Sequence, residues 1–389
     1  MNNFQFYNPA RIIFGKDTEK DVASYVKKYG KKVLLHYGGG SIKQSGLYDV
    51  IIQNLHDNQV DFVELGGVVP NPVLSKVEEG IDVCRKENVD FILAVGGGSV
   101  IDSAKAIAIG VKSNLNVWDY YYDNSNVIVD ALNIGCVLTI AAAGSESSPA
   151  SVITDESSQL KRYVNSEHII PKFAILNPEL TSTLPPYQTA CGASDILAHL
   201  FERYFSPTEH VDLTDRLLEA AISTILKFAP IAYNEPNNYE ARAEIMWCGT
   251  VAHNNILSTG RQTDWASHNI EHEISGIYDL AHGAGLSIIF PAWMKYVYKE
   301  QINKFVQLAR RVFNIKDDSL NKELVVNTLI IKIENWYKSI NLPIRLSEID
   351  IDDQNFELMS KKALDGRESL GALKKLNSSD VFKIYELAL

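Results

Sequence analysis

The stretch Asp90-Phe-Ile-Leu-Ala-Val-Gly-Gly-Gly-Ser99 indicates the fold class, because an apolar run of strand length ends there in three glycines and a serine. Apolar residues at helical spacing then fill residues 100–109. The same order occurs at residues 32–41, where a second apolar run ends in Gly38-Gly-Gly-Ser41. Repeated strand–glycine–helix units predict a mostly parallel sheet with helices on both of its faces.

The pattern changes near Leu184-Pro185-Pro186. Before it we expect two more strands, at residues 60–65 and 135–140. After it the apolar spacing is helical throughout, over residues 188–204, 212–228, 239–257, 263–276, 301–313 and 319–340. The chain has 389 residues, and a single core stops growing at roughly 250–300 residues. We therefore predict an α/β dinucleotide-binding domain over residues 1–187 and an all-helical domain over residues 188–389.

Charge and cysteine content exclude several classes of protein. The chain has 48 acidic and 37 basic side chains, a net charge of -11, which argues against nucleic acid and anionic membranes as partners. No apolar run approaches the roughly 20 residues of a transmembrane helix, and the first residues lack the features of a signal peptide. Four well-separated cysteines form neither a metal pair nor a disulfide framework: Cys84, Cys136, Cys191 and Cys248. We expect a cytoplasmic protein with reduced thiols.

The two glycine turns are candidate phosphate-binding loops. A glycine-rich turn between strand and helix lets the backbone approach a phosphate, and the amides of the helix N-terminus face the anion. The turn at residues 96–99 matches neither the G-x-G-x-x-G nor the Walker pattern. Taken alone, it also fits a tight turn without a ligand.

The turn at residues 38–43 predicts which nicotinamide cofactor is preferred. Enzymes that use NAD often place a carboxylate near the end of this strand to bind the ribose 2′-hydroxyl. Here the turn offers three glycines, Ser41 and Lys43, with no carboxylate. A hydroxyl and a cation suit a 2′-phosphate better, so we predict NADP(H).

Aspartate and histidine residues in the second half form a candidate metal site. Asp195 and His199 are four residues apart, as are His268 and His272, and His282 follows ten residues later. On a helix this spacing puts both members of a pair on one face. One carboxylate with two or three imidazoles suits Zn, Fe, Co or Mn, and the lack of cysteine ligands argues against a closed structural zinc site. The spacing alone leaves open which histidines bind.

One alternative uses the same residues differently. His268-Asn-Ile-Glu271-His272 matches the H-x-x-E-H pattern of a class of metalloproteases. That interpretation leaves Asp195, His199, His282 and both glycine turns without a role.

Several motifs occur together in a family-like order and spacing: Gly96-Gly-Gly-Ser-x-x-Asp102, Thr139 with Gly144-Ser-Glu146, Asp195-x-x-x-His199, His268-x-x-x-His272 and His282-Gly283. With them the chain resembles the iron-containing, or group III, alcohol dehydrogenase family. Within that family it is similar to the NADPH-dependent butanol dehydrogenase and aldehyde reductase branch. The resemblance runs from Asn8-Pro-Ala-Arg-Ile-Ile-Phe-Gly15 to the C-terminal helix.

The resemblance implies a dehydroquinate-synthase-like fold with an α/β nucleotide domain and an all-helical metal domain. It implies one divalent ion, iron or zinc, with Asp195, His199, His268 and His282 as its ligands. His272 would lie beside the nicotinamide and the substrate as a proton relay, without binding the metal.

The family also implies a set of positions that line the cofactor: Gly39, Ser41, Asn71, Gly97, Gly98, Ser99, Asp102, Thr139, Lys161 and Thr183. One departure is visible, because Ala143 stands where the family commonly has threonine. One hydrogen bond to the cofactor is therefore expected to be missing.

We thus predict a metal-dependent, NADP(H)-linked alcohol dehydrogenase or aldehyde reductase acting on aliphatic aldehydes such as butanal. The resemblance also implies a homodimer. An NAD-linked polyol dehydrogenase of the glycerol type is the main alternative, disfavoured by the turn at residues 38–43. A lyase of the dehydroquinate synthase type would need clustered basic residues near the ligand motifs, and the arginines of the second half are scattered.

Overall fold

The computed structural model describes residues 1–123, 125–315, 321–364 and 366–389. The chain forms two compact units. The α/β unit comprises Tyr7–Leu184 and Asn237–Asn254, and the helical unit comprises Met1–Phe6, Pro185–Pro236 and Asn255–Leu389. Each unit is therefore built from segments that are not contiguous in the sequence. The two-domain division at residue 187 stays a prediction.

A six-stranded parallel sheet forms the centre of the α/β unit, in the order β1-β8-β5-β4-β2-β3. Its strands are β1 (Arg11–Phe14), β2 (Lys32–Gly38), β3 (Asp61–Val68), β4 (Phe91–Gly96), β5 (Asn133–Leu138) and β8 (Phe173–Leu176). The chain runs from β2 to its neighbour β3 and then returns to β4 on the other side of β2. The sheet therefore reverses its winding between β2 and β4, and ligands of such sheets bind beyond the carboxyl ends of the strands at this point.

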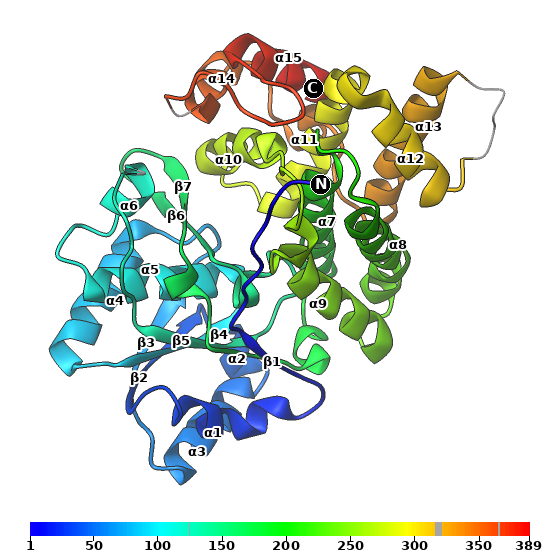
Figure 1. The fold of residues 1–389 in the computed structure, drawn as a ribbon. Coiled ribbons are helices and arrows are strands. Elements are labelled where there is room, and N and C mark those ends of the chain that lie inside the picture. Colours follow the sequence, from blue (N-terminus) through cyan, green and yellow to red (C-terminus); the bar gives the residue numbers. More distant parts are fainter. Residues whose placement is uncertain (124, 316–320, 365) are drawn as a thin grey trace. The chain divides into compact units, whose positions relative to one another are not determined.

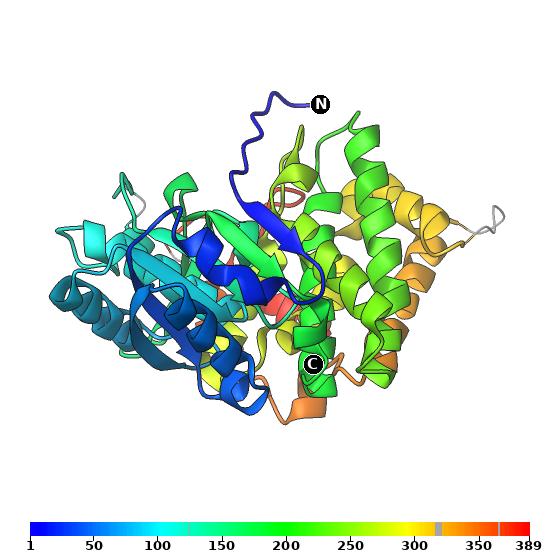
Figure 2. The same cartoon turned by 90° about the horizontal axis from the view of Figure 1, so that it is seen from below.

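Helices cover both faces of this sheet, as predicted (Figure 1). They are α1 (Val22–Val26), α2 (Ser41–Gln44), α3 (Leu47–Asp57), α4 (Leu74–Glu87), α5 (Gly98–Lys112) and α6 (Asp119–Tyr122). Alternate residues of β4 enter two separate cores, with Phe91 and Leu93 on the side of α1 and α3 and Ile92 on the side of α4 and α5. Figure 2, seen from below, places α1 and α3 in front of the strands.

A β-hairpin and one late helix complete the α/β unit. The hairpin pairs β6 (Ala150–Asp155) with β7 (Leu160–Asn165) in antiparallel register. The late helix is α9 (Tyr239–His253), which the sequence pattern assigns to the C-terminal domain. Thr250 of α9 donates a hydrogen bond of 2.5 Å to the buried carboxylate of Glu146, and this contact ties α9 to the turn after β5.

The helical unit carries no strand among its described residues. Its helices are α7 (Pro186–Tyr204), α8 (Asp212–Asn234), α10 (Ala266–Tyr278), α11 (His282–Val297), α12 (Ile302–Arg311), α13 (Lys322–Ser339), α14 (Phe356–Leu364) and α15 (Ser378–Ala388). Local chemistry sets their ends: Pro186 opens α7, and Asn377 with Asp380 forms a capping box on α15. Across the described ranges, every helix is too short or too polar to cross a lipid bilayer.

Candidate functional site

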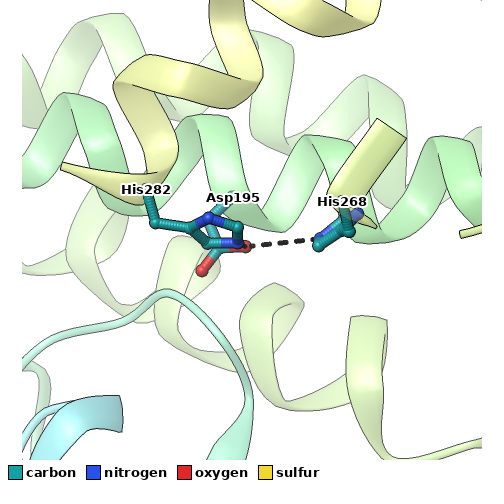
Figure 3. A group of neighbouring side chains, drawn as sticks. All are labelled: Asp195, His268 and His282. Atoms are coloured by element: carbon teal, nitrogen blue, oxygen red, sulfur yellow. Dashed lines mark ion pairs between the residues drawn. The ribbon is translucent and has the colours of Figure 1, made fainter. Parts of the chain in front are cut away.

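Three helices of the helical unit bring the predicted metal ligands together. Asp195 and His199 lie one turn apart on α7, His268 lies in the first turn of α10, and His282 is the first residue of α11. Figure 3 shows the rings of His268 and His282 directed at the carboxylate of Asp195. Helix α7 and the later, consecutive helices α10 and α11 therefore converge on one carboxylate.

Nitrogen atoms of three histidines surround one atom, Oδ1 of Asp195. The Nε2 atom of His199 lies 3.6 Å from it, that of His282 3.9 Å and that of His268 4.0 Å. These separations are too long for hydrogen bonds. Two ligand atoms that each bind a tetrahedral ion at about 2.0–2.2 Å lie about 3.3–3.6 Å apart, close to the separations found here.

The burial and chemistry of the group fit a divalent transition metal. Asp195, His199 and His268 are buried, and Nε2 of His268 has no hydrogen-bond partner among the described residues. A buried polar atom without a partner is energetically costly unless a ligand satisfies it. His282 keeps 24% of its side chain exposed, which leaves one side of the group open, as catalytic metal sites require.

Two buried glutamates contact the Nδ1 atoms of two of these histidines, on the side of each ring opposite Nε2. Glu202 Oε1 lies 2.7 Å from Nδ1 of His268, and Glu271 Oε2 contacts Nδ1 of His282. Metal-binding histidines commonly pair their second nitrogen with a carboxylate in this way. Neither role was predicted from the sequence. The signal for Glu202 was present, because it follows Asp195 and His199 at i+7 and i+3 on the same face of α7.

His272 lies beside the metal group without joining it. Its ring centroid is 5.4 Å from that of His282, and the side chain is half-buried. Glu271, which the metalloprotease alternative needs as a solvent-accessible base, is fully buried against His282 and Ser275. The geometry therefore contradicts that alternative.

In the α/β unit, the two glycine turns follow neighbouring strands. Tyr37 of β2 pairs with Val95 of β4, so Gly39 and Ser41 leave the sheet next to the turn at residues 97–99. A Cβ atom on Gly97 would lie 3.1 Å from Ile140, and one on Gly98 would lie 3.3 Å from Cβ of Ala143. Glycine thus lets the start of α5 approach the segment after β5, which begins at Thr139.

Three more predicted cofactor residues lie around this edge of the sheet. Lys161 of β7 donates a hydrogen bond of 3.0 Å to the side-chain oxygen of Asn71. The backbone amide of Thr139 donates to the carbonyl of Gly96 at the end of β4. Thr183 is exposed. It lies in the sequence between the 3-10 turn Pro178–Thr181 and α7, and it takes part in neither of these two hydrogen bonds.

Asp102 supports the turn after β5. Its carboxylate accepts hydrogen bonds from Ser145 Oγ at 2.5 Å and from the amide of Val152 at 3.1 Å. Burial raises the pKa of this carboxyl, and the charge of Lys105 opposes the shift. Asp102 therefore fixes the loop and the hairpin that flank the glycine turn.

Lys105, one turn further along α5, is fully buried and surrounded by oxygen atoms. Its ammonium lies 2.7–3.3 Å from the carbonyl and hydroxyl oxygens of Ser145 and Ser148 and from the carbonyl of Ala150. Burial lowers the pKa of Lys105 to about 8. This one side chain therefore anchors residues 145–150 to the helix that begins at the glycine turn.

Two charged side chains, Glu64 and Lys43, contact the same pair of tyrosines near the turn after β2. The carboxylate of Glu64 on β3 accepts hydrogen bonds of 3.0 Å from the phenols of Tyr37 and Tyr48. The ammonium of Lys43 lies over both rings, 4.6 Å from the centroid of Tyr48 and 5.1 Å from that of Tyr37. The nearby carboxylate is thus engaged by phenols, while the lysine stays exposed.

Comparison with protein families covers nearly the whole chain. Residues 9–178 match the family described as iron-containing alcohol dehydrogenase. Residues 189–389 match the C-terminal domain of the Fe-containing alcohol dehydrogenase family.

Individual relatives match over their full length. The chain is 41% identical to the probable NADH-dependent butanol dehydrogenase 1 of Bacillus subtilis, covering 100% of both chains. It is 34% identical to the NADPH-dependent aldehyde reductase YqhD of Escherichia coli, again covering 100% of both. Among solved structures, NADH-dependent butanol dehydrogenase A of Thermotoga maritima superposes with a TM-score of 0.96 at 39% identity, covering 100% of this chain and 99% of that one.

Proposed function

Because this chain belongs to the iron-containing alcohol dehydrogenase family, we propose that it interconverts aliphatic aldehydes such as butanal and their alcohols with NADP(H) and one bound iron or zinc ion. The chain is an oxidoreductase of the alcohol dehydrogenase type, and its family binds a nicotinamide cofactor and a metal ion. The aldehyde, the cofactor preference and the choice of metal are the proposed parts.

The observation that carries the proposal is the convergence of three Nε2 atoms on Asp195 Oδ1 at 3.6–4.0 Å. We assign Asp195, His199, His268 and His282 as the ligands. When bound there, the ion supplies a Lewis acid for the carbonyl oxygen, and the nicotinamide supplies the hydride. The four side chains hold the ion, and the exposed edge of His282 leaves a position for the substrate.

We assign the proton transfer to His272. An imidazole titrates near neutral pH and can move a proton to or from an alcohol oxygen through one of its ring nitrogens. His272 is half-buried and adjoins His282 without a place in the ligand group. It is therefore placed to exchange protons with solvent near the metal.

The turn at residues 38–43 supports NADP(H). It presents Ser41 and the exposed ammonium of Lys43, while the carboxylate of Glu64 is engaged by two phenols. The pKa of Lys43 is raised above its usual range, first through its interaction with Tyr37, so it stays cationic at neutral pH. The relatives include enzymes named for NADH and for NADPH, so the preference must be measured for this chain.

A homodimer is also part of the proposal. Met1, Phe4 and Phe6 of the N-terminal segment are exposed in the helical unit by 62%, 56% and 44%. Apolar side chains clustered in this way are typical of surfaces that associate. Light scattering on the intact protein should therefore give about twice the chain mass of 43.4 kDa.

One experiment with two arms tests the catalytic proposal. Protein stripped of metal should not oxidise NADPH with butanal, and reloading with iron(II) or zinc should restore activity, with NADPH used more efficiently than NADH. In the second arm, His272→Ala should lower kcat by about 10²–10⁴-fold at unchanged metal content. Full activity without metal, or loss of metal from the His272 variant, would contradict the assignment.

A further inference from the structure

Glu271 is a buried carboxylate on α10 between two histidines with assigned roles, His268 and His272. It has no exposed surface. One oxygen, Oε2, contacts Nδ1 of His282, and the other, Oε1, accepts a hydrogen bond from Ser275 Oγ. Each oxygen of this carboxylate therefore has a polar neighbour inside the helical unit.

The start of α11 is shaped to admit this carboxylate. A Cβ atom on Gly285 would lie 2.3 Å from Oε1 of Glu271, 2.6 Å from its Cγ and 2.8 Å from its Cδ. Real Cβ atoms do not approach so closely, so only glycine at residue 285 leaves room for Glu271 in this position. The contact with His282 thus depends on the carboxylate of Glu271 on α10 and on the glycine at residue 285 on α11.

The contact determines which nitrogen of His282 is available to a metal. When Glu271 is ionised, its carboxylate can only accept a hydrogen bond, and Nδ1 of His282 then carries the proton. In a neutral imidazole the other nitrogen then presents its lone pair. That nitrogen, Nε2, lies 3.9 Å from Oδ1 of Asp195, on the side where the ligand atoms converge.

Glu271, His272 and His282 also form a group whose potential ligand atoms lie within 4.8 Å of one another. The nitrogen of His282 that contacts Glu271 in this group is Nδ1. The ligands facing Asp195 use the opposite nitrogen of the same ring. Glu271 therefore fits a supporting role better than a role as a ligand.

We propose that Glu271 is a positioning residue for the metal, which fixes the tautomer and orientation of His282 and adds a buried negative charge that strengthens binding of the divalent ion. The inference rests on the metal site of the proposed function. Glu202 pairs with His268 similarly, but it also accepts from the amides of Trp265 and His268 at the start of α10. Its substitution would disturb the backbone, so Glu271 is the residue to test.

The test measures the affinity for zinc by competition with a chromophoric chelator. Glu271→Gln keeps the size of the side chain and removes the charge, and it should weaken zinc binding by about 10–100-fold. Glu273→Gln is the matched control, because Glu273 is also buried on α10 but pairs with Lys362 at 3.6 Å. Its zinc affinity should stay within about twofold of wild type, since its carboxylate pairs with a lysine.

The outcomes distinguish a failure of the role of Glu271 from a failure of the metal site. Equal zinc affinity for wild type, Glu271→Gln and Glu273→Gln would overturn the role of Glu271 and leave the metal site standing. A wild-type protein that binds no zinc or iron(II) would overturn the metal site itself. Thermal unfolding of the metal-free proteins checks that each variant folds. If Glu271→Gln does not fold, Gly285→Ala is the second variant to test. Its added Cβ atom should displace the carboxylate of Glu271 and weaken zinc binding. An unchanged zinc affinity of this variant would contradict the proposal.

Discussion

Lys105 in the α/β unit and His268 in the helical unit are both buried polar side chains, yet their surroundings differ. Lys105 has five protein oxygens within 3.3 Å of its ammonium. Nε2 of His268 has no hydrogen-bond partner among the described residues, and its closest approach to Asp195 Oδ1 is 4.0 Å. The ammonium of Lys105 is fully hydrogen-bonded by protein oxygens and stabilises the fold, whereas the group around His268 fits the proposed metal ion.

The comparison predicts that substitutions in the metal group act mainly on metal content and activity. Asp195→Ala should lose the metal and reduce activity by more than about 100-fold, because every histidine of the group faces this carboxylate. Metal analysis and the NADPH assay measure both effects. Asp215→Ala is the contrasting control, since Asp215 is buried and paired with Arg261 and Lys304. The Asp215 variant should lose stability and keep its metal. An Asp195 variant with full metal content would contradict the assignment of Asp195 as a ligand.

Substitutions in the cluster of Lys105 and its oxygen partners should act mainly on stability. Lys105→Met removes a buried charge and leaves several carbonyl oxygens without a donor, so the free energy of unfolding in urea should fall by about 3–5 kcal/mol. Lys112→Met is the control on the same helix, because Lys112 is exposed by 42% and lies 3.7 Å from Asp130. It should change stability by less than about 1 kcal/mol. A Lys105 variant as stable as the control would show that the cluster is not a structural anchor.

His36 contrasts with His268, because it is a buried histidine whose two nitrogens both have protein partners. Nδ1 donates to the carbonyl of Leu65, so Nε2 accepts from Ser103 Oγ, both at 2.9 Å. Burial lowers the pKa of His36 to about 4. Between pH 6.5 and pH 4 the unfolded chain binds a proton that the folded chain does not. The free energy of unfolding should therefore fall over this range, by at most about 3 kcal/mol from this residue.

The measurement for His36 is urea unfolding at several pH values for the wild type and His36→Gln. The wild type should lose more stability than the variant on going from pH 6.5 to pH 4. His56→Gln is the control, because His56 is 81% exposed on α3 and should leave the pH dependence as in wild type. Parallel curves for the wild type and His36→Gln would contradict the prediction.

Strand and helix patterns predicted most of the fold. The runs at 32–37 and 90–95 are β2 and β4, and the helical pattern at 188–204 is α7. The assignment of α9 to the α/β unit could not be predicted, because amphipathic spacing shows that a helix has a buried face without showing what covers it. The hairpin β6–β7 was also not predicted, because its two strands have six residues each and half of these residues are polar.

The candidate metal ligands could be found in the sequence, but spacing alone could not choose among the histidines. His268 and His272 are one turn apart on α10, and the choice depends on where the start of α11 lies. A Cβ atom on Gly283 would lie 2.0 Å from the carbonyl oxygen of Cys191, so α11 packs directly against α7. This tertiary contact, which brings His282 to Asp195, has no periodic signal in the sequence.

The proposed ligand set can be tested by anomalous diffraction from crystals of the zinc-loaded protein. The account predicts one strong peak per chain at about 2.0–2.2 Å from Asp195 Oδ1 and from Nε2 of His199, His268 and His282. A peak bound through Nδ1 of His282 and Glu271, or a zinc ion elsewhere in the chain, would contradict it.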